Sequence, residues 1–351
     1  MRKMLLAALM LLTLPLAAKD KAKKTSGNPI LPEFHADPEV LFSNQTGKFY
    51  IYSTTDGAAG WGGYYFTVFS SPDLVNWTHE GIMLNLNTDV AWASGNAWAP
   101  CIEEVKQKDG TYKYYFYFSG HDTKRNRKSI GVAVAERPTG PFLDEGIIVS
   151  DDDRPQGVRG GQAIDVDVFQ DPVSGKFYLY WGNGFMAGAE LNGDMLSIKK
   201  ETTTNLTPQG GTLQDYAYRE APYVFYRKGT YYFMWSVDDT GSPNYHVCYA
   251  TAKSPLGPFT IDPEHYDVLR QVPEQGIYGT AHNSVLQIPG KDEWYIVYHR
   301  INKNFVNDRE KGGPGVHREV CIDKMEFDKK GNIIPVTPTV DGPAPLRNTK
   351  K

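Results

Sequence analysis

The sequence predicts an all-β fold, a five-bladed β-propeller, from three observations. The 351 residues include 22 Tyr, 16 Phe and 7 Trp together with 34 Gly and 23 Pro, a composition typical of many short strands joined by tight turns. An aromatic segment recurs five times, at intervals of 54 to 65 residues. No segment of 12 or more residues has the 3.6-residue periodicity of an amphipathic helix, which argues against alternating strands and helices.

Each repeat has the same internal order. An apolar strand and a turn precede the aromatic segment, and a third strand follows it, as at 66–71, 130–135 and 247–252. A two-sheet sandwich could use the same strands but would not explain five repeats in one order. The interval suits a four-stranded blade with its loops, and in a propeller the first strand of every blade lines the central channel. The aromatic segments lie at 47–52, 112–117, 175–180, 229–235 and 292–298.

The ends of the chain indicate its organisation and location. Residues 1–18 combine Arg2 and Lys3, an apolar run and two small residues, the pattern of a signal peptide. We expect a flexible segment at 19–27, one propeller domain at 28–340 and a C-terminal tail at 341–351. Because no Cys follows the apolar run, a secreted or periplasmic protein is expected rather than a lipoprotein.

Charge and cysteine content exclude several function classes. A formal net charge of −4 without a basic patch argues against nucleic-acid binding, and no apolar stretch is long enough to span a membrane comfortably. Three widely spaced Cys form neither a disulfide framework nor a metal cluster.

Five residues are expected to converge at one end of the channel. The aromatic anchors of the repeats are Phe49, Tyr114, Phe177, Tyr231 and Trp294. The five residues lie 12 positions before the anchor in three repeats, and 11 and 16 positions before it in the others. Taken singly, each has an ordinary explanation, such as a turn residue before proline, a solvated strand carboxylate, a surface ion pair or a core aromatic. Because all five occupy a similar position within their repeats, a functional site is favoured. They are Asp37, Trp98, Asp165, Glu220 and His282.

Three carboxylates beside aromatic side chains suggest glycoside hydrolysis. That reaction requires one protonated acid for the leaving oxygen and one ionised carboxylate as base or nucleophile. A third carboxylate raises the pKa of the acid through like-charge repulsion. Aromatic faces stack on sugar rings, so the loop at 61–65, with Trp61 and two tyrosines, is a further candidate for sugar binding. These residues alone do not rank the three carboxylates.

The motifs that carry these residues resemble glycoside hydrolase family 43. The resemblance runs from about Asn28 to about Pro338 and implies a five-bladed propeller that acts with inversion on polysaccharides containing arabinose or xylose. It departs from the family pattern at Glu33, Val166 and Ala221, which affects the shape of the site rather than a carboxylate. The matching segments are 28–38, 98–100, 163–165, 219–222 and 279–282.

The resemblance also implies roles. Asp37 is similar to the general base, Glu220 to the general acid, and Asp165 to the carboxylate that raises the pKa of the acid and orients it. Phe34 and Trp98 resemble the aromatic walls of the sugar pocket, and Arg300 resembles an arginine that reaches sugar hydroxyls.

His282 resembles a histidine near an ion in the channel, often calcium and often held through water. Calcium prefers oxygen ligands over neutral imidazole, so any contact with His282 is expected through water. The chemistry itself requires no cofactor.

The expected activity is removal of terminal α-L-arabinofuranosyl residues from hemicellulose, arabinan or arabinogalactan. The chain has no room for the C-terminal β-sandwich of several related xylosidases, which favours arabinose over xylose. A β-D-xylosidase, an endo-acting arabinanase or xylanase, and a non-catalytic carbohydrate-binding propeller are the alternatives.

Overall fold

The computed structural model describes residues 25–310 and 312–346. The expected signal peptide lies outside the described residues, as do most of the 19–27 segment and the end of the C-terminal tail. Within the described ranges, no helix has the length and apolar character needed to cross a membrane.

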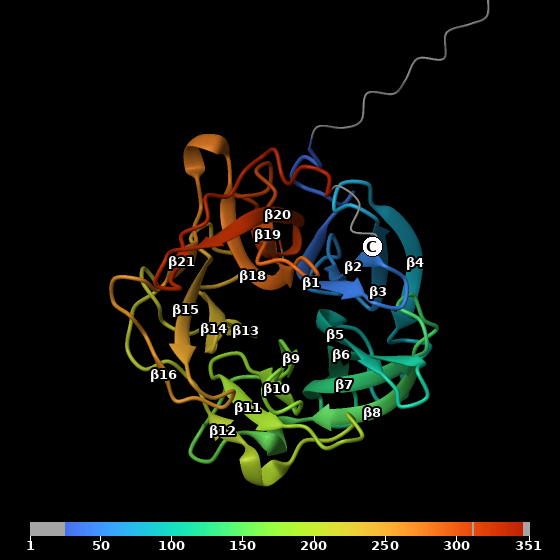
Figure 1. Ribbon diagram of the computed structural model, residues 1–351. Coiled ribbons are helices and arrows are strands. Elements are labelled where there is room, and N and C mark those ends of the chain that lie inside the picture. Colours follow the sequence, from blue (N-terminus) through green and yellow to red (C-terminus); the bar gives the residue numbers. More distant parts are fainter. Residues whose placement is uncertain (1–24, 311, 347–351) are drawn as a thin grey trace, which may run out of the picture.

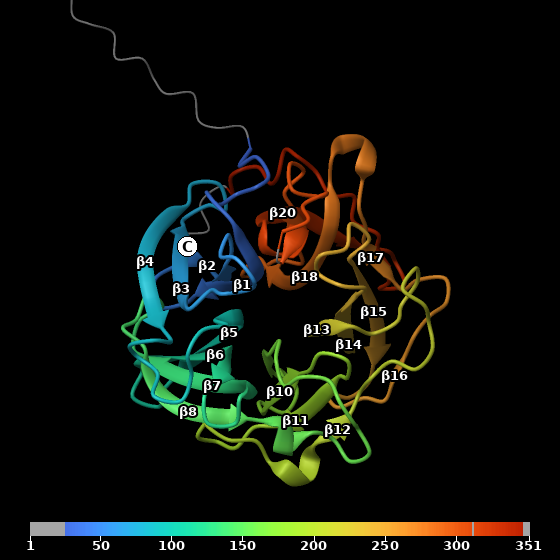
Figure 2. The ribbon, with the colours of Figure 1, turned by 180° about the vertical axis from the view of Figure 1, so that it is seen from behind.

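The strands form five antiparallel sheets arranged in a ring (Figures 1 and 2). Blade 1 contains β1 (His35–Ser43), β2 (Lys48–Thr55), β3 (Tyr65–Ser71) and β4 (Thr78–Asn85). Blade 2 contains β5 (Trp98–Lys106), β6 (Tyr112–Asp122), β7 (Arg127–Ala135) and β8 (Leu143–Val149). Blade 3 contains β9 (Asp167–Gln170), β10 (Phe177–Trp181), β11 (Ala187–Glu190) and β12 (Thr204–Asn205).

Blades 4 and 5 follow the same order. Blade 4 contains β13 (Glu220–Arg227), β14 (Thr230–Val237), β15 (His246–Ala252) and β16 (Phe259–Thr260), and β17 (Asp267–Leu269) also pairs with β15. Blade 5 contains β18 (Tyr278–Gln287), β19 (Trp294–Ile301), β20 (Arg318–Phe327) and β21 (Ile333–Ile334). The short 3-10 helices are η1 (Asp151–Asp153), η2 (Lys200–Thr202), η3 (Pro273–Gln275) and η4 (Gly313–Val316).

The first strand of each sheet lies nearest the centre of the ring in both views. The all-β, five-bladed propeller predicted from the sequence is therefore confirmed. Each inner strand pairs with the aromatic strand that follows it in the chain, as the repeat predicted.

The core is divided into five clusters, each between two neighbouring blades. The aromatic strands supply both of their faces to these clusters. Tyr50 and Tyr52 of β2 pack toward blade 2, whereas Phe49 and Ile51 pack toward blade 5. Successive side chains on a strand point to opposite faces, and a strand buried on both faces is apolar throughout. Burial between blades therefore explains why the aromatic segments stand out in the sequence.

The ring is closed by the segment that precedes β1. The N–H of Ile30 donates to the carbonyl of Val320 on β20 at 2.9 Å, and the N–H of Gly27 donates to Asp341 at 2.8 Å. The guanidinium of Arg300 donates to the carbonyl of Asn28 at 2.9 Å. Contacts between the two ends of the described chain thus join blade 5 to blade 1.

A bulge interrupts the inner strand at the same place in four blades. In β1, β5, β13 and β18 the register with the second strand skips two residues. The first of the two unpaired residues is Asp37 in β1, Ala99 in β5, Ala221 in β13 and His282 in β18. In blade 3 the corresponding residue is Asp165, which precedes β9. All five have positive φ, between 42° and 59°. A non-glycine residue rarely adopts this conformation, and bulges are known to redirect side chains beside active sites.

Candidate active site

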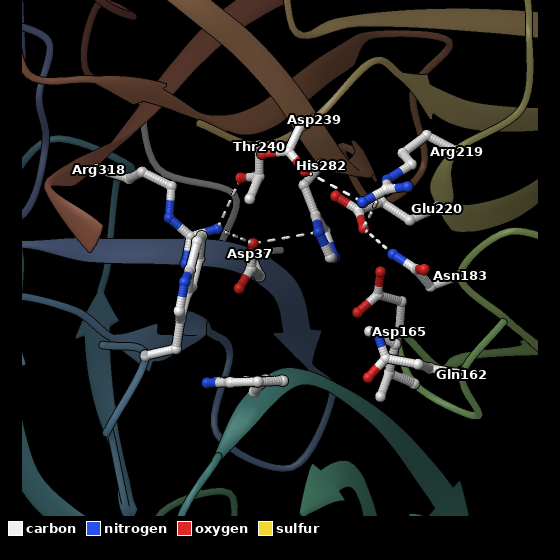
Figure 3. Close-up of a pocket in the computed structure, with 13 residues that line it drawn as sticks. Asp37, Gln162, Asp165, Asn183, Arg219, Glu220, Asp239, Thr240, His282 and Arg318 are labelled. Atoms are coloured by element: carbon white, nitrogen blue, oxygen red, sulfur yellow. Dashed lines mark hydrogen bonds and ion pairs between the residues drawn. The ribbon is translucent and has the colours of Figure 1, made fainter. Parts of the chain in front are cut away.

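A pocket of about 280 Å³ opens at the bulged end of the inner strands. Figure 3 shows Asp37 on one side of the pocket, with Arg318 and His282 beside it, and Asp165 and Glu220 on the other side. The pocket thus brings together the five residues expected to converge. Its lining residues are Asp37, Trp61, Trp98, Gln162, Ile164, Asp165, Asn183, Arg219, Glu220, Asp239, Thr240, His282 and Arg318.

The five residues do not all occupy the same position in their blades, which corrects the expectation that they would. Asp37, Asp165 and His282 lie at the left-handed bulge position, but Trp98 and Glu220 lie one residue earlier. Trp98 pairs with Ser119 and Glu220 pairs with Ser236, as Ala36 pairs with Thr54. Counting back from the aromatic strand fails because the hairpins between the two strands differ in length.

The bulge positions are anchored by side chains of the preceding blade. The N–H groups of Ala99, Asp165 and His282 donate to the hydroxyls of Thr54, Ser119 and Ser236 at 2.8, 3.1 and 3.0 Å. The N–H of Asp37 donates to Nδ1 of His299 at 3.1 Å. Burial lowers the pKa of His299 to about 3, so its ring is neutral and can accept this bond.

Blade 3 differs because its residue at the position of these accepting side chains is Gly182, which has no side chain to accept a bond. An added Cβ at Gly182, whose φ is +130°, would lie 2.1 Å from the carbonyl oxygen of Phe185, so the backbone there has no room for a side chain. The N–H of Ala221 instead donates to Oδ2 of Asp165 at 3.3 Å. Asp165 is therefore held against the residue that follows Glu220.

Asp37 is surrounded by donors. Oδ1 accepts from Nη1 of Arg318 at 2.8 Å and lies 3.1 Å from Nδ1 of His282, and Oδ2 accepts from the hydroxyl of Thr54 at 2.7 Å. Burial acts to raise the pKa of Asp37, but the charge of Arg318 and then the contact with His282 outweigh it and hold that pKa well below its ordinary value. Asp37 is consequently an ionised carboxylate, as a general base must be.

The opposite side of the pocket has the reverse electrostatic character. Burial, followed by the charge of Glu220, raises the pKa of Asp165 well above its ordinary value. Burial also raises the pKa of Glu220, although bonds from Tyr245 (2.8 Å to Oε1) and from the Asn183 amide, and the charge of Arg219, oppose it. Two adjacent buried carboxyls with raised pKa values retain a proton between them.

Two indoles form walls of the pocket, as stacking on a sugar requires. Trp61 and Trp98 meet edge to face, with ring centroids 6.4 Å apart. The guanidinium of Arg318 lies 5.7 Å from the Trp61 ring, and the amine of Lys128 lies 4.7 Å from the Trp98 ring. Trp98 and the 61–65 loop were both expected from the sequence to face a sugar.

Two residues assigned from the resemblance are not among those that line the pocket. Phe34 packs edge to face on Phe305 and on His317 and is not among the residues that line the pocket. Arg300 contacts Glu319 at 3.2 Å and closes the ring through Asn28, so it also lies outside the pocket lining.

The arginine beside Asp37 is Arg318, which sequence reasoning missed. Its Nε and Nη2 donate to the two oxygens of Asp56 at 2.8 and 2.9 Å, which orients Nη1 toward Asp37. No local pattern around Arg318 indicates this role. The prolines after Asp37, Ala99 and Ala221 are a signal that could have revealed the bulge, since each directly follows a left-handed residue.

The donors around His282 do not match a direct calcium site. Calcium takes about six to eight oxygen ligands, whereas Nδ1 of His282 contacts a carboxylate already paired with Arg318. Among the described residues, the one group of three His, Cys, Asp or Glu with ligand atoms close together is His246, Cys248 and Asp267, away from the pocket. The calcium ion implied by the resemblance stays a prediction.

Comparisons with known proteins agree with the geometry. Residues 26–333 match the model of Glycosyl hydrolases family 43. The β-D-galactofuranosidase xynD of Aspergillus niger is 36% identical over 335 residues, covering 93% of this chain and 89% of that protein.

Two solved structures have the same fold. A thermostable family-43 glycoside hydrolase is 26% identical with a TM-score of 0.73, covering 92% of this chain and 100% of that one. An α-L-arabinofuranosidase from Clostridium thermocellum is 30% identical with a TM-score of 0.65, covering 88% and 95%. The chain belongs to glycosyl hydrolases family 43 and is a glycoside hydrolase that acts on a sugar substrate.

Proposed function

We propose that the protein removes terminal furanosyl residues, first of all α-L-arabinofuranosyl groups, from plant-type polysaccharides with inversion at the anomeric carbon. The observation that carries the proposal is the contrast across the pocket: an ionised Asp37 faces a pair of carboxyls that retains a proton. An inverting glycosidase requires one base and one acid on opposite sides of the scissile bond.

The steps follow from this arrangement. Asp37 takes a proton from a water molecule, and the water oxygen bonds to the anomeric carbon. The bond from that carbon to the leaving oxygen breaks, and Glu220 donates its proton to the leaving oxygen. Burial keeps the pKa of Glu220 high, and bonds from Tyr245 and Asn183 orient its carboxyl. Asp165, held by the N–H of Ala221, forms with Glu220 the pair of carboxyls that retains a proton. Exchange with solvent returns the proton from Asp37 and restores it to Glu220.

Arg318 contributes to the base rather than to the acid. Its charge stabilises ionised Asp37, and Asp56 holds the guanidinium in place by two bonds. Such bidentate pairs fix orientation as well as charge. His282 and Thr54 restrict the same carboxylate from two other directions.

The similarity to a β-D-galactofuranosidase supports a furanose as the sugar in the pocket and favours a second candidate activity, removal of terminal β-D-galactofuranosyl groups. The rings of α-L-arabinofuranose and β-D-galactofuranose share the configuration of their hydroxyls and differ in the exocyclic chain. A pocket that recognises the ring therefore suits both sugars, and the space beyond the exocyclic carbon separates them.

The test compares three chromogenic substrates on one enzyme preparation: 4-nitrophenyl α-L-arabinofuranoside, β-D-galactofuranoside and β-D-xylopyranoside. We expect the highest kcat/KM for the arabinofuranoside. If kcat/KM were highest for the galactofuranoside, removal of β-D-galactofuranosyl groups would become the first candidate activity. If it were highest for the xyloside, the furanose assignment would be overturned.

The stereochemical outcome is tested by proton NMR of the anomer that forms first. Initial formation of the retained anomer would contradict the roles given to Asp37 and Glu220, because a retaining enzyme needs a nucleophile in place of the base.

A further inference from the structure

A second hollow of about 330 Å³ adjoins the catalytic pocket. Gln162 lines both cavities, so the two are neighbours at that residue. The hollow is formed where β6 ends and β7 begins, together with the loop before β9. Its other lining residues are His121, Asn126, Arg127, Lys128, Asp151 and Gly161.

The hollow has an excess of positive charge. Its one lining carboxylate, Asp151, is already paired with Arg154 at 2.8 Å and lies 3.6 Å from Arg127. Lys128 has no carboxylate within 4.0 Å among the described residues, and its amine instead donates to Oδ1 of Asn96. The side chain of Arg127 is 67% exposed and can turn toward a ligand.

Lys128 stands at the junction of the two cavities. It lines the hollow, and its amine lies 4.7 Å from the ring of Trp98, which lines the catalytic pocket. Burial lowers the pKa of Lys128, the expected effect of placing a cation where no anion compensates it. This amine is therefore a cation in the hollow with which an anion can pair.

The hollow adjoins the side of the pocket that holds the acid. Gln162 and Asn183 exchange two backbone hydrogen bonds of 3.0 Å, and the side chain of Asn183 donates to Oε2 of Glu220. The leaving group of the substrate must lie beside Glu220 to receive its proton. The hollow is therefore in position to hold the part of the saccharide that leaves.

We propose that this hollow binds a uronic acid residue in the leaving-group portion of the substrate, with its carboxylate on Lys128 and Arg127. The inference rests on the proposed function only in taking Glu220 as the acid. Charge-assisted bonds from ammonium and guanidinium groups to a carboxylate are stronger than those to neutral hydroxyls. The preferred substrate is thus an acidic polysaccharide, such as an arabinosylated xylan with glucuronate or a pectic chain with galacturonate.

The test measures binding without turnover. Glu220→Gln enzyme is titrated in a calorimeter with acidic oligosaccharides from a glucuronoarabinoxylan and from an arabinosylated pectin, and with the same oligosaccharides after reduction of their carboxyl groups to alcohols. We expect the acidic form from at least one source to bind about 3- to 10-fold more tightly, the range of a partly exposed ion pair. The two sources distinguish glucuronate from galacturonate.

Two substitutions assign the effect to the hollow. Lys128→Gln in the Glu220→Gln background should remove most of the preference for the acidic form, and Arg127→Gln should remove part of it. The matched control is Lys108→Gln, an exposed lysine at the opposite end of blade 2, which should keep the preference. Because charges attract less in salt, 0.5 M NaCl should also reduce the preference in the parent enzyme.

Equal binding of the acidic and reduced forms, no binding of either, or a preference unchanged by Lys128→Gln would overturn the inference. Turnover of the 4-nitrophenyl glycosides by the unmodified enzyme tests the proposed function separately. Activity on those substrates without any carboxylate preference would therefore reject the uronic acid site and leave the glycosidase assignment standing.

Discussion

Asp37 and Asp165 occupy the same bulge position in blades 1 and 3, with φ values of 49° and 59°, yet their surroundings are opposite. Asp37 receives Arg318, His282 and Thr54, all from other strands, and its pKa falls. Asp165 receives one backbone N–H, and burial, followed by the charge of Glu220, raises its pKa. The comparison shows that a repeat can supply equivalent positions while the adjoining blades decide which carboxylate is a base and which belongs to an acid pair.

Replacing the base should have the largest effect. Asp37→Asn removes the proton acceptor for water, so kcat/KM should fall by about 10²- to 10⁴-fold on polysaccharide and on 4-nitrophenyl substrates alike. Steady-state kinetics on both substrates measure this. A much smaller loss on either substrate, in a variant whose circular dichroism is unchanged, would contradict the role of Asp37.

Replacing the acid should separate the two substrates. Glu220→Gln should reduce kcat/KM on polysaccharide by about 10²- to 10⁴-fold, but less on the nitrophenyl glycoside, whose leaving group needs little protonation. The ratio of the two losses is the measurement. If both substrates lost activity equally, Glu220 would not be the proton donor.

Removing the cation beside the base should move one limb of the pH profile. In Arg318→Gln the pKa of Asp37 rises because its main charge partner is gone, and the base must be ionised to act. The acidic limb of kcat/KM against pH should therefore shift to higher pH, with a loss of about 10- to 100-fold at mildly acidic pH. An unchanged acidic limb would show that Arg318 does not tune the base.

Removing the neighbour of the acid should move the other limb, with a smaller effect. Asp165→Asn takes a like charge away from Glu220, whose pKa then falls, and the acid must be protonated to act. We expect the basic limb to shift to lower pH and activity at neutral pH to fall by about 10-fold. A shift of the acidic limb instead would exchange the roles of the two sides of the pocket.

Much of the site could be predicted because its carboxylates lie in local motifs. Asp37, Asp165 and Glu220 each precede an aromatic strand in a recurring unit, and the structure brings all three to one pocket. Trp98 was found in the same way. Phe34 and Arg300 were placed by resemblance alone, and the structure puts both outside the pocket lining.

That Arg318 rather than Arg300 lines the pocket has a simple geometric cause. On the paired strands β19 and β20, Arg300 lies opposite Glu319, and Arg318 lies opposite Ile301, one step along the ladder. Adjacent steps point to opposite faces of a sheet. Arg300 therefore reaches the closing segment at Asn28, whereas Arg318 reaches Asp37.

The sequence by itself determined the all-β class, the number of blades and the three carboxylates that meet at the pocket, because apolar alternation and turns are local and repeat along the chain. Tertiary structure alone decided which arginine faces the base, where Trp98 and Glu220 lie relative to the bulges, and which carboxyls keep a proton. These depend on groups far apart in the chain, such as Arg318 and Asp37 at a separation of 281 residues, whose contact exists only once the ring has closed.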